Sequence, residues 1–187
     1  QTYTGLYSSA ASDVYKRQLM TFLNAQADQV RFVIINTQDE HFAHLLTDPR
    51  NDSGRFIPDV YHETNTQGVG LMYRVIDVPG LLERLQPHDF GGQTCTVRLI
   101  INDSFLPENA GSMVLRFEHG QGQRVENAPP DVEVGLDIAD FSSLLVGTIN
   151  FSSLVRYGLA HISDPAHIPT LDRIFHVYEK PICTTPF

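Results

Sequence analysis

The chain has 187 residues, enough for one domain with its own core and part of another. Hydrophobic residues make up 42% and charged residues 19%, which is typical of a folded globular protein and excludes a disordered one. The formal net charge of -9, without a stripe of Lys and Arg, argues against nucleic acid as a partner. No apolar run approaches the ~20 residues that span a bilayer, so no membrane association is expected.

Two cysteines, Cys95 and Cys183, are too few for a disulfide scaffold or a structural zinc site. Reduced thiols favour a cytoplasmic protein. The stretch Asp13-Val-Tyr-Lys-Arg-Gln18 resembles the translated end of a transposon used in preparing sequencing libraries. We therefore predict that residues 1–18 are a sequencing or assembly scar, and that the chain is a C-terminal fragment of a longer protein.

Helix, strand and helix follow in the first third of the chain. The apolar spacing predicts a helix over Leu19–Ala27, and the β-branched run Gln29–Asn36 predicts a strand. A short helix is expected over Asp39–Leu46, with Asp39 as its cap. This order is typical of the closing part of an α/β layer. Residues 51–68 are polar and turn-rich, which predicts a linker or exposed loop.

A second unit is predicted over residues 69–187, beginning with strands. The expected strands are Met72–Val78, Thr94–Asn102, Ser112–Glu118 and Val132–Leu136, with a short one near Arg124–Val125. A helix over Gly80–Leu85 separates the first two strands, and Pro79 stands where a helix tolerates proline.

The spacing of apolar residues then changes from that of strands to that of helices. Three helices are expected: Asp137–Val146, Phe151–Tyr157 and Thr170–Val177. Asp137 or Asp140 caps the first of them, and Gly147 ends it. Strands followed by helices predict an α+β domain with a mainly antiparallel sheet and helices on one face.

No interior motif carries strong chemistry. His41 and His44 share a helix face but lack a third ligand, so a solvated face is expected and no metal site. The glycines of His119-Gly-Gln-Gly122 lack the context of a phosphate-binding loop and indicate a hairpin. Ser142-Ser143 and Ser152-Ser153 lack a nucleophile elbow. Asp103 and Asn109 suit turn chemistry.

The apolar ending Lys180-Pro-Ile-Cys-Thr-Thr-Pro-Phe187 is unlike a fraying terminus. Burial of Phe187 would carry its α-carboxylate inward, where a group with a pKa near ~3.5 can accept a proton. Two alternatives follow from the residues alone: the end merely packs, or the terminal carboxylate of Phe187 is a catalytic base.

Three stretches resemble the C-terminal portion of the Eis-type acetyltransferases, the enhanced intracellular survival proteins of the GNAT superfamily. Phe22-Leu-Asn with Val30-Arg-Phe-Val and Leu45-Leu-Thr-Asp-Pro-Arg50 is similar to the end of that family's second GNAT-like domain. Tyr73-Arg-Val-Ile-Asp-Val-Pro79 is similar to the strand that begins the sterol-carrier-like domain. The third stretch combines Asn109-Ala-Gly111, Leu144-Leu-Val-Gly147 and the ending Pro181 to Phe187.

The resemblance implies an α/β GNAT-like remnant over residues 19–50, followed by a sterol-carrier-like domain over residues 69–187. It implies transfer of an acetyl group from acetyl-CoA to a primary amine, with the carboxylate of Phe187 as the general base. The acetyl-CoA site lies in a domain that this chain lacks, so the chain is expected to be inactive alone. The best-known family members carry a glutamate as a substrate contact where this chain has Pro186, which argues against an aminoglycoside-like acceptor. The resemblance also implies a homo-oligomer, a hexamer.

A different hypothesis is a free-standing sterol-carrier-like module that binds an apolar ligand between sheet and helices, without catalysis. A third makes the domain an assembly element within a larger protein. The stretch Phe22–Arg50 favours the acetyltransferase, because a lone carrier domain has no need of it.

Overall fold

The computed structural model describes most of the chain, in two compact units. The described residues are 5–7, 13–37, 39, 41–56, 61–68, 72–178, 180 and 181. The first unit lies within residues 1–71, and the second spans Met72–Pro181. Each unit is described by itself.

The described residues of the first unit form a parallel pair of short strands and one α-helix. Strand β1 (Gly5–Tyr7) pairs with β2 (Ile34–Asn36), and helix α1 covers Asp13–Asn24. A strand over Gln29–Asn36 was predicted, but its partner has three residues, so only the last three of the run form a ladder. The helix predicted over Asp39–Leu46 is a 3-10 helix, η1 (Phe42–Leu45). Both β1 and the first turns of α1 lie in the segment interpreted from sequence as a scar.

The second unit is built on a five-stranded sheet in the order β5-β4-β3-β6-β7. Its strands are β3 (Cys95–Asn102), β4 (Gly111–Glu118), β5 (Gln121–Val125), β6 (Val132–Asp137) and β7 (Ala160–Ile162). The central strands β3 and β6 are parallel, and the other neighbouring pairs of this sheet are antiparallel. The sheet is therefore mixed, with the antiparallel majority that was predicted.

Side chains alternate across the sheet, and one face of it forms the core. In β3 the buried residues are Cys95, Val97, Leu99 and Ile101. The ladder places Leu99 between Met113 of β4 and Val134 of β6, both of which are also buried. On the opposite face Arg98 forms an ion pair with Glu133, at 3.0 Å between Nη1 and Oε1. This alternation was legible in the sequence because one face of the sheet is apolar.

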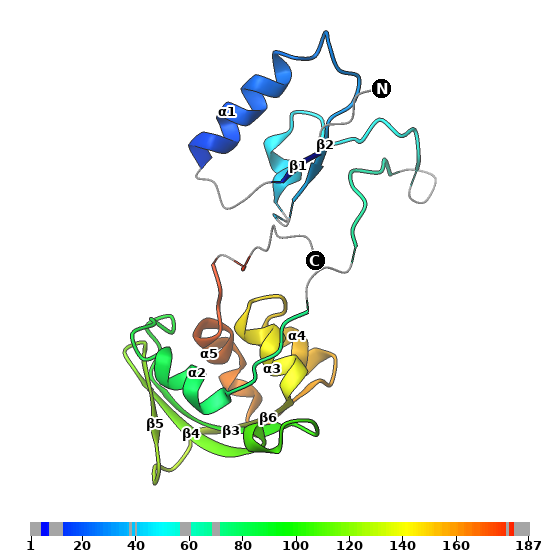
Figure 1. The fold of residues 1–187 in the computed structure, drawn as a ribbon. Helices are drawn as coiled ribbons and strands as arrows, with labels where there is room; N and C mark the ends of the chain where they lie inside the picture. Colours follow the sequence, from blue (N-terminus) through cyan, green and yellow to red (C-terminus); the bar gives the residue numbers. More distant parts are fainter. Residues whose placement is uncertain are drawn as a thin grey trace. The chain divides into compact units, whose positions relative to one another are not determined.

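Four α-helices cover the apolar face of the sheet (Figure 1). They are α2 (Val78–Arg84), α3 (Ile138–Leu145), α4 (Phe151–Arg156) and α5 (Ile168–Ile174). Asp77, Asp137 and Asn150 cap the first three through bonds from backbone N–H groups to their side chains. Gly147 follows α3 with a φ of +71°, in agreement with the predicted stop. Short 3-10 helices, η2 (Pro107–Asn109) and η3 (Pro165–His167), lie in the connections.

Three predictions for this unit need correction. Residues 72–77 form no ladder and bend at Ile76, and the predicted strand ends in a helix, because α2 begins at Val78. Helix α5 begins at Ile168 and ends at Ile174, earlier than predicted, because Pro169 fits the first turn. Strand β7 was missed because it has only three residues, too few for a periodic signal.

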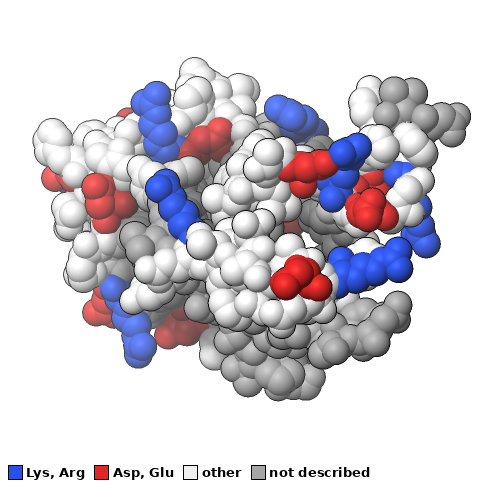
Figure 2. All heavy atoms as spheres, turned by 90° about the horizontal axis from the view of Figure 1, so that it is seen from above, with Lys and Arg blue, Asp and Glu red and all other residues white. Residues whose placement is uncertain are grey.

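Charged side chains of both signs are interspersed on the face of the molecule seen in Figure 2. The basic residues that the structure describes there form no continuous stripe.

Candidate functional site

A cleft of about 540 Å³ opens between the loop after α2, the end of α3 and the end of α5. Its lining residues are Leu85, His88, Asp89, Phe90, Gly91, Leu145, Arg173, Ile174, Phe175, His176, Val177 and Tyr178. The volume lies within the ~300–1,000 Å³ of small-molecule sites. The hypothesis of a sterol-carrier-like module expects an apolar ligand between sheet and helices, but the sequence indicated none of these residues as its lining.

Apolar side chains form the buried part of the cleft. Phe90, Ile174 and Phe175 belong to the core, and the Phe90 ring packs edge-on against Phe117 at 5.0 Å between centroids. Leu85 and Leu145 are partly buried against the same core. The floor is thus part of the packed interior and is formed before any ligand arrives.

Polar and aromatic side chains form the exposed rim. His88 packs edge-on against Phe90, and His176 against Tyr178, with centroids 4.8 and 4.6 Å apart. The Asp89 side chain stabilises the turn that follows it, because its Oδ1 accepts a hydrogen bond from Gly92 N–H at 2.9 Å. The cleft therefore combines an apolar floor with a titratable rim, which suits an amphipathic or apolar small molecule.

Gly91 holds the two walls of the cleft close together. Its φ is +67°, and a Cβ at this position would lie 2.6 Å from the carbonyl oxygen of Arg173 in α5. Only glycine fits both the conformation and the approach. The pair Gly91-Gly92 is the sequence signal that could have indicated a close backbone approach here.

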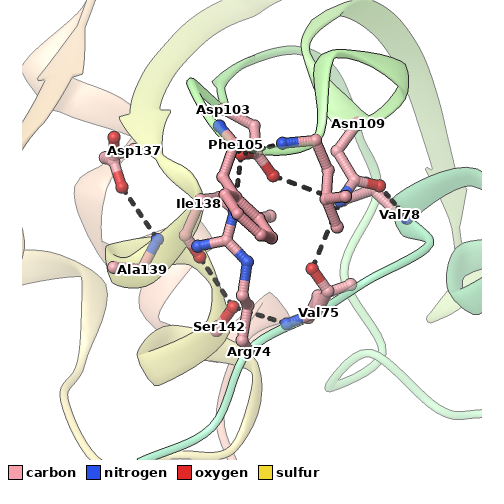
Figure 3. Close-up of polar contacts among 11 residues, drawn as sticks. Arg74, Val75, Val78, Asp103, Phe105, Asn109, Asp137, Ile138, Ala139 and Ser142 are labelled. Carbon is pink, nitrogen blue, oxygen red and sulfur yellow. Dashed lines mark hydrogen bonds and ion pairs between the residues drawn. The ribbon is translucent and has the colours of Figure 1, made fainter.

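A cluster of buried polar groups fastens segment 72–77 to the rest of the second unit (Figure 3). Asp103, Asn109 and Ser142 are its buried members. Ser142 Oγ accepts from Val75 N–H at 2.9 Å and donates to the carbonyl of Ile138 at 2.6 Å. The backbone of Val75 is therefore satisfied by side chains, which explains why this segment has no strand partner.

Asn109 makes three hydrogen bonds from one buried amide. Its Oδ1 accepts from Val78 N–H at 3.0 Å, and its Nδ2 donates to the carbonyl of Val75 at 3.3 Å and to Asp103 Oδ2 at 3.2 Å. The start of α2 and the segment before it are both held by this side chain.

The Asp103 carboxylate lies at the centre of the cluster. Its Oδ1 accepts from the N–H groups of Phe105 and Leu106, each at 2.9 Å, and from Arg74 Nη2 at 2.5 Å. Burial by itself raises the pKa of Asp103. The hydrogen bonds, first those from Leu106 and Phe105, together with the charge of Arg74, outweigh burial and hold that pKa below its usual range. Asp103 is thus an ionised structural group, and its role in a turn agrees with the sequence analysis.

Cys95, His167 and Asp164 lie in a row that superficially resembles a nucleophile, a base and an orienting carboxylate. Cys95 Sγ lies 3.9 Å from His167 Nδ1, and His167 Nε2 lies 3.8 Å from Asp164 Oδ2. Burial first, and then the charge of Asp131, raises the pKa of the Cys95 thiol. A buried thiol whose pKa is raised is a poor nucleophile, so this row has a packing role.

The other sequence candidates do not converge. His41 and His44 lie with ring centroids 6.3 Å apart, and no group of three His, Cys, Asp or Glu side chains among the described residues could hold a metal ion. Ser143 Oγ donates to the carbonyl of Ala139, a bond internal to α3. Phe187 and Cys183 lie outside the described residues. In the part of the chain that the structure describes, every helix is too short or too polar to cross a bilayer.

Comparisons with solved structures show which known folds the chain is similar to. The crystal structure of Eis1 from Mycobacterium abscessus matches with a TM-score of 0.70 at 20% identity, over 100% of this chain and 44% of that chain. The chain thus spans less than half of that protein. This likeness shows a shared fold.

Two further similarities are weaker. Sterol carrier protein-2 like-3 from Aedes aegypti matches with a TM-score of 0.38 at 20% identity, over 52% of this chain and 92% of that one. A GCN5-related N-acetyltransferase from Kribbella flavida matches with a TM-score of 0.39 at 24% identity, over 46% of this chain and 22% of that chain. Scores of this size are too low to support a structural argument.

Sequence comparisons place the second unit in a family. No curated protein matches the chain. The model of the family described as the sterol carrier protein domain matches residues 78–184, which is more than half of the 187 residues. These residues contain the five-stranded sheet and the four helices that cover it. The chain therefore belongs to the sterol carrier protein domain family.

Proposed function

We propose that this chain is the C-terminal part of an Eis-like N-acetyltransferase, with a GNAT-like remnant over residues 19–50 before its sterol carrier domain. The similarity to Eis1 carries the proposal, because it extends over the whole chain at a TM-score of 0.70 and not over the carrier domain alone. A carrier module by itself has no need of the first unit. The longer protein would act in the cytoplasm, as a homo-oligomer.

In the proposed reaction a primary amine attacks the acetyl carbonyl. The N–C bond forms, the C–S bond breaks, and the released thiolate takes up a proton. Acetyl-CoA supplies the acetyl group as a thioester, bound in a domain outside this chain. The α-carboxylate of Phe187 accepts the proton that the amine must lose before its lone pair can attack. A terminal carboxylate is ionised at neutral pH, so it can accept a proton.

The test is an assay of two proteins, the 187-residue chain and the longer protein encoded with its upstream sequence. We expect transfer of acetyl groups from acetyl-CoA to a primary amine by the longer protein, and none above background by the chain alone. Release of free thiol measures the rate. An upstream sequence without an acetyl-CoA-binding domain, or a longer protein without transfer, would remove the proposal.

The cleft supports a second candidate function, binding of an apolar ligand without catalysis. Its floor of Phe90, Ile174 and Phe175 is preformed and apolar, and its volume of about 540 Å³ accepts a small molecule. This function does not exclude the first, since the two use different parts of the chain.

Filling the cleft should abolish such binding. We expect the 187-residue chain to bind 1-anilinonaphthalene-8-sulfonate saturably, and Leu145→Trp to weaken that binding at least tenfold, or by ~1.4 kcal/mol. Fluorescence titration gives the dissociation constants. Leu159→Trp is the matched control, because Leu159 is exposed and does not line the cleft. Equal affinities for both variants would show that the probe binds elsewhere.

A further inference from the structure

One wall of the cleft is a short stretch of chain that follows α5. Residues 175–178 line the cleft and lie outside the helices and strands, and we call them the exit wall. The backbone N–H groups of Phe175 and His176 still bond to carbonyls of α5. No other described residue forms a hydrogen bond with the backbone of Val177 or Tyr178. The far part of the exit wall is therefore weakly held, because backbone hydrogen bonds do not fix it.

Val177 rests on Gly147, just beyond the end of α3. A Cβ at Gly147 would lie 2.6 Å from the Cβ of Val177, whereas carbon atoms in favourable contact are about 3.5–4.0 Å apart. The Cβ of Val177 is joined directly to the main chain, so a change of rotamer cannot move it away. Because glycine has no side chain, Gly147 lets the exit wall approach the end of α3, where Leu145 lines the cleft from the other side.

Tyr73 holds the chain just after the exit wall. Its Oη donates a hydrogen bond to the carbonyl of Pro181 at 3.1 Å. Tyr73 is itself held in place, because the buried Ser142 side chain binds the N–H of Val75 two residues on. Neither Tyr73 nor Gly147 lines the cleft. Both contact the chain of the exit wall, or its continuation, from outside the cleft.

We propose that Tyr73 and Gly147 are positioning residues of the cleft, which hold the exit wall where a bound apolar ligand contacts it and thereby set the affinity. The inference rests on the ligand-binding function proposed for the cleft. A ligand that touches the exit wall binds best when the wall is already in place, because ordering it on binding would cost part of the binding free energy. By linkage, a bound ligand in turn strengthens the hold on Pro181.

Removing one oxygen atom tests the role of Tyr73. Tyr73→Phe loses the hydrogen bond to Pro181 and keeps the ring. We expect the 187-residue chain to lose about twofold to tenfold in affinity for 1-anilinonaphthalene-8-sulfonate, the range that one such hydrogen bond contributes. Stopped-flow fluorescence should show the loss mainly as faster dissociation of the probe. Tyr157→Phe is the matched control, because Tyr157 is exposed and does not line the cleft.

A reporter in the exit wall separates positioning from a general loss of stability. The chain has no tryptophan, and Tyr178 is 91% exposed, so Tyr178→Trp places a single fluorophore in the wall. Without ligand, its fluorescence anisotropy should fall when Tyr73→Phe is added, because the wall moves more freely. It should not change when Tyr157→Phe is added. Equal anisotropy in all three proteins would show that Tyr73 does not hold the exit wall.

A pair of glycines tests the contact with Val177. Gly147 and Gly158 have φ values of +71° and +72°, so alanine strains the backbone similarly at both positions. A Cβ at Gly158 would have no atom within 4 Å, so only Gly147→Ala displaces the exit wall. We expect both variants to melt at a lower temperature, and Gly147→Ala alone to bind the probe about tenfold more weakly.

The outcomes distinguish the inference from the function on which it rests. A native 187-residue chain that binds no probe overturns the ligand-binding function and the inference together. Native affinity in both Tyr73→Phe and Gly147→Ala overturns the inference alone. Native affinity in one of them removes that residue from the positioning role.

Discussion

In the proposed acetyltransferase, blocking the carboxyl terminus is expected to lower kcat for acetyl transfer by about 10²–10⁴-fold, the usual effect of a positioned proton acceptor. Adding a short Gly-Ser extension after Phe187 moves the carboxylate away from the amine and places a neutral peptide bond there. Binding of acetyl-CoA should not change, because the proposed acetyl-CoA site lies in another domain. The rate of thiol release and the affinity for acetyl-CoA, measured on the same preparation, check both parts.

Two controls separate the charge of the terminus from its bulk. Phe187→Leu keeps an apolar last residue and its α-carboxylate, so we expect most of the rate to remain. A semisynthetic protein that ends in a C-terminal amide has the native length but no charge, and we expect it to be as slow as the extended one. Full turnover by the amidated protein would show that another group takes the proton.

Removing the Asn109 side chain should cause the largest loss of stability among the polar substitutions in the second unit. Asn109→Ala leaves the N–H of Val78 and the carbonyl of Val75 without their partners. Each unpaired buried polar group costs about 1–3 kcal/mol, so for two groups we expect a loss of about 2–6 kcal/mol in the free energy of unfolding. Urea unfolding of the 187-residue chain, followed by circular dichroism, gives the value.

Two further asparagine substitutions serve as controls for Asn109→Ala. Asn127 is exposed, and Asn127→Ala should change the free energy of unfolding by less than about 0.5 kcal/mol. Asn109→Asp still offers an acceptor to Val78, but it places a carboxylate oxygen against Asp103 and the carbonyl of Val75. We therefore expect no rescue at neutral pH. A stable Asn109→Ala variant would mean that the segment before α2 is held by other contacts.

The sheet was predictable where one face of a strand is apolar. The predicted strands Thr94–Asn102 and Ser112–Glu118 agree with β3 and β4 within one residue. Apolar and polar side chains alternate along a half-buried strand whichever strand lies beside it, so the pattern can be read from the sequence alone. The segment Met72–Val78 has the same alternation and is not a strand. Its backbone bonds go to Ser142 and Asn109, far along the chain, and nothing local in the sequence distinguishes them from a ladder.

The cleft was not predicted, although the pair Gly91-Gly92 is a signal of a close backbone approach. It depends on the approach of Gly91 to the carbonyl of Arg173, two residues far apart in sequence whose side chains play no part in that contact. Polar turn residues were easier, because Asp103 bonds to the N–H groups two and three residues ahead. Hydrogen bonds between residues close in sequence could be predicted, whereas contacts between distant backbone segments could not.

The bond between Tyr73 and Pro181 brings the two ends of the second unit together. A unit whose ends meet can be added to a longer chain, or removed from one, without a bridge across its surface, and it tolerates circular permutation. The sterol carrier fold of this protein can therefore be inserted into a longer chain as one unit. Gene fusion could join it to a catalytic domain at a single place and leave its sheet, its helices and its cleft unchanged.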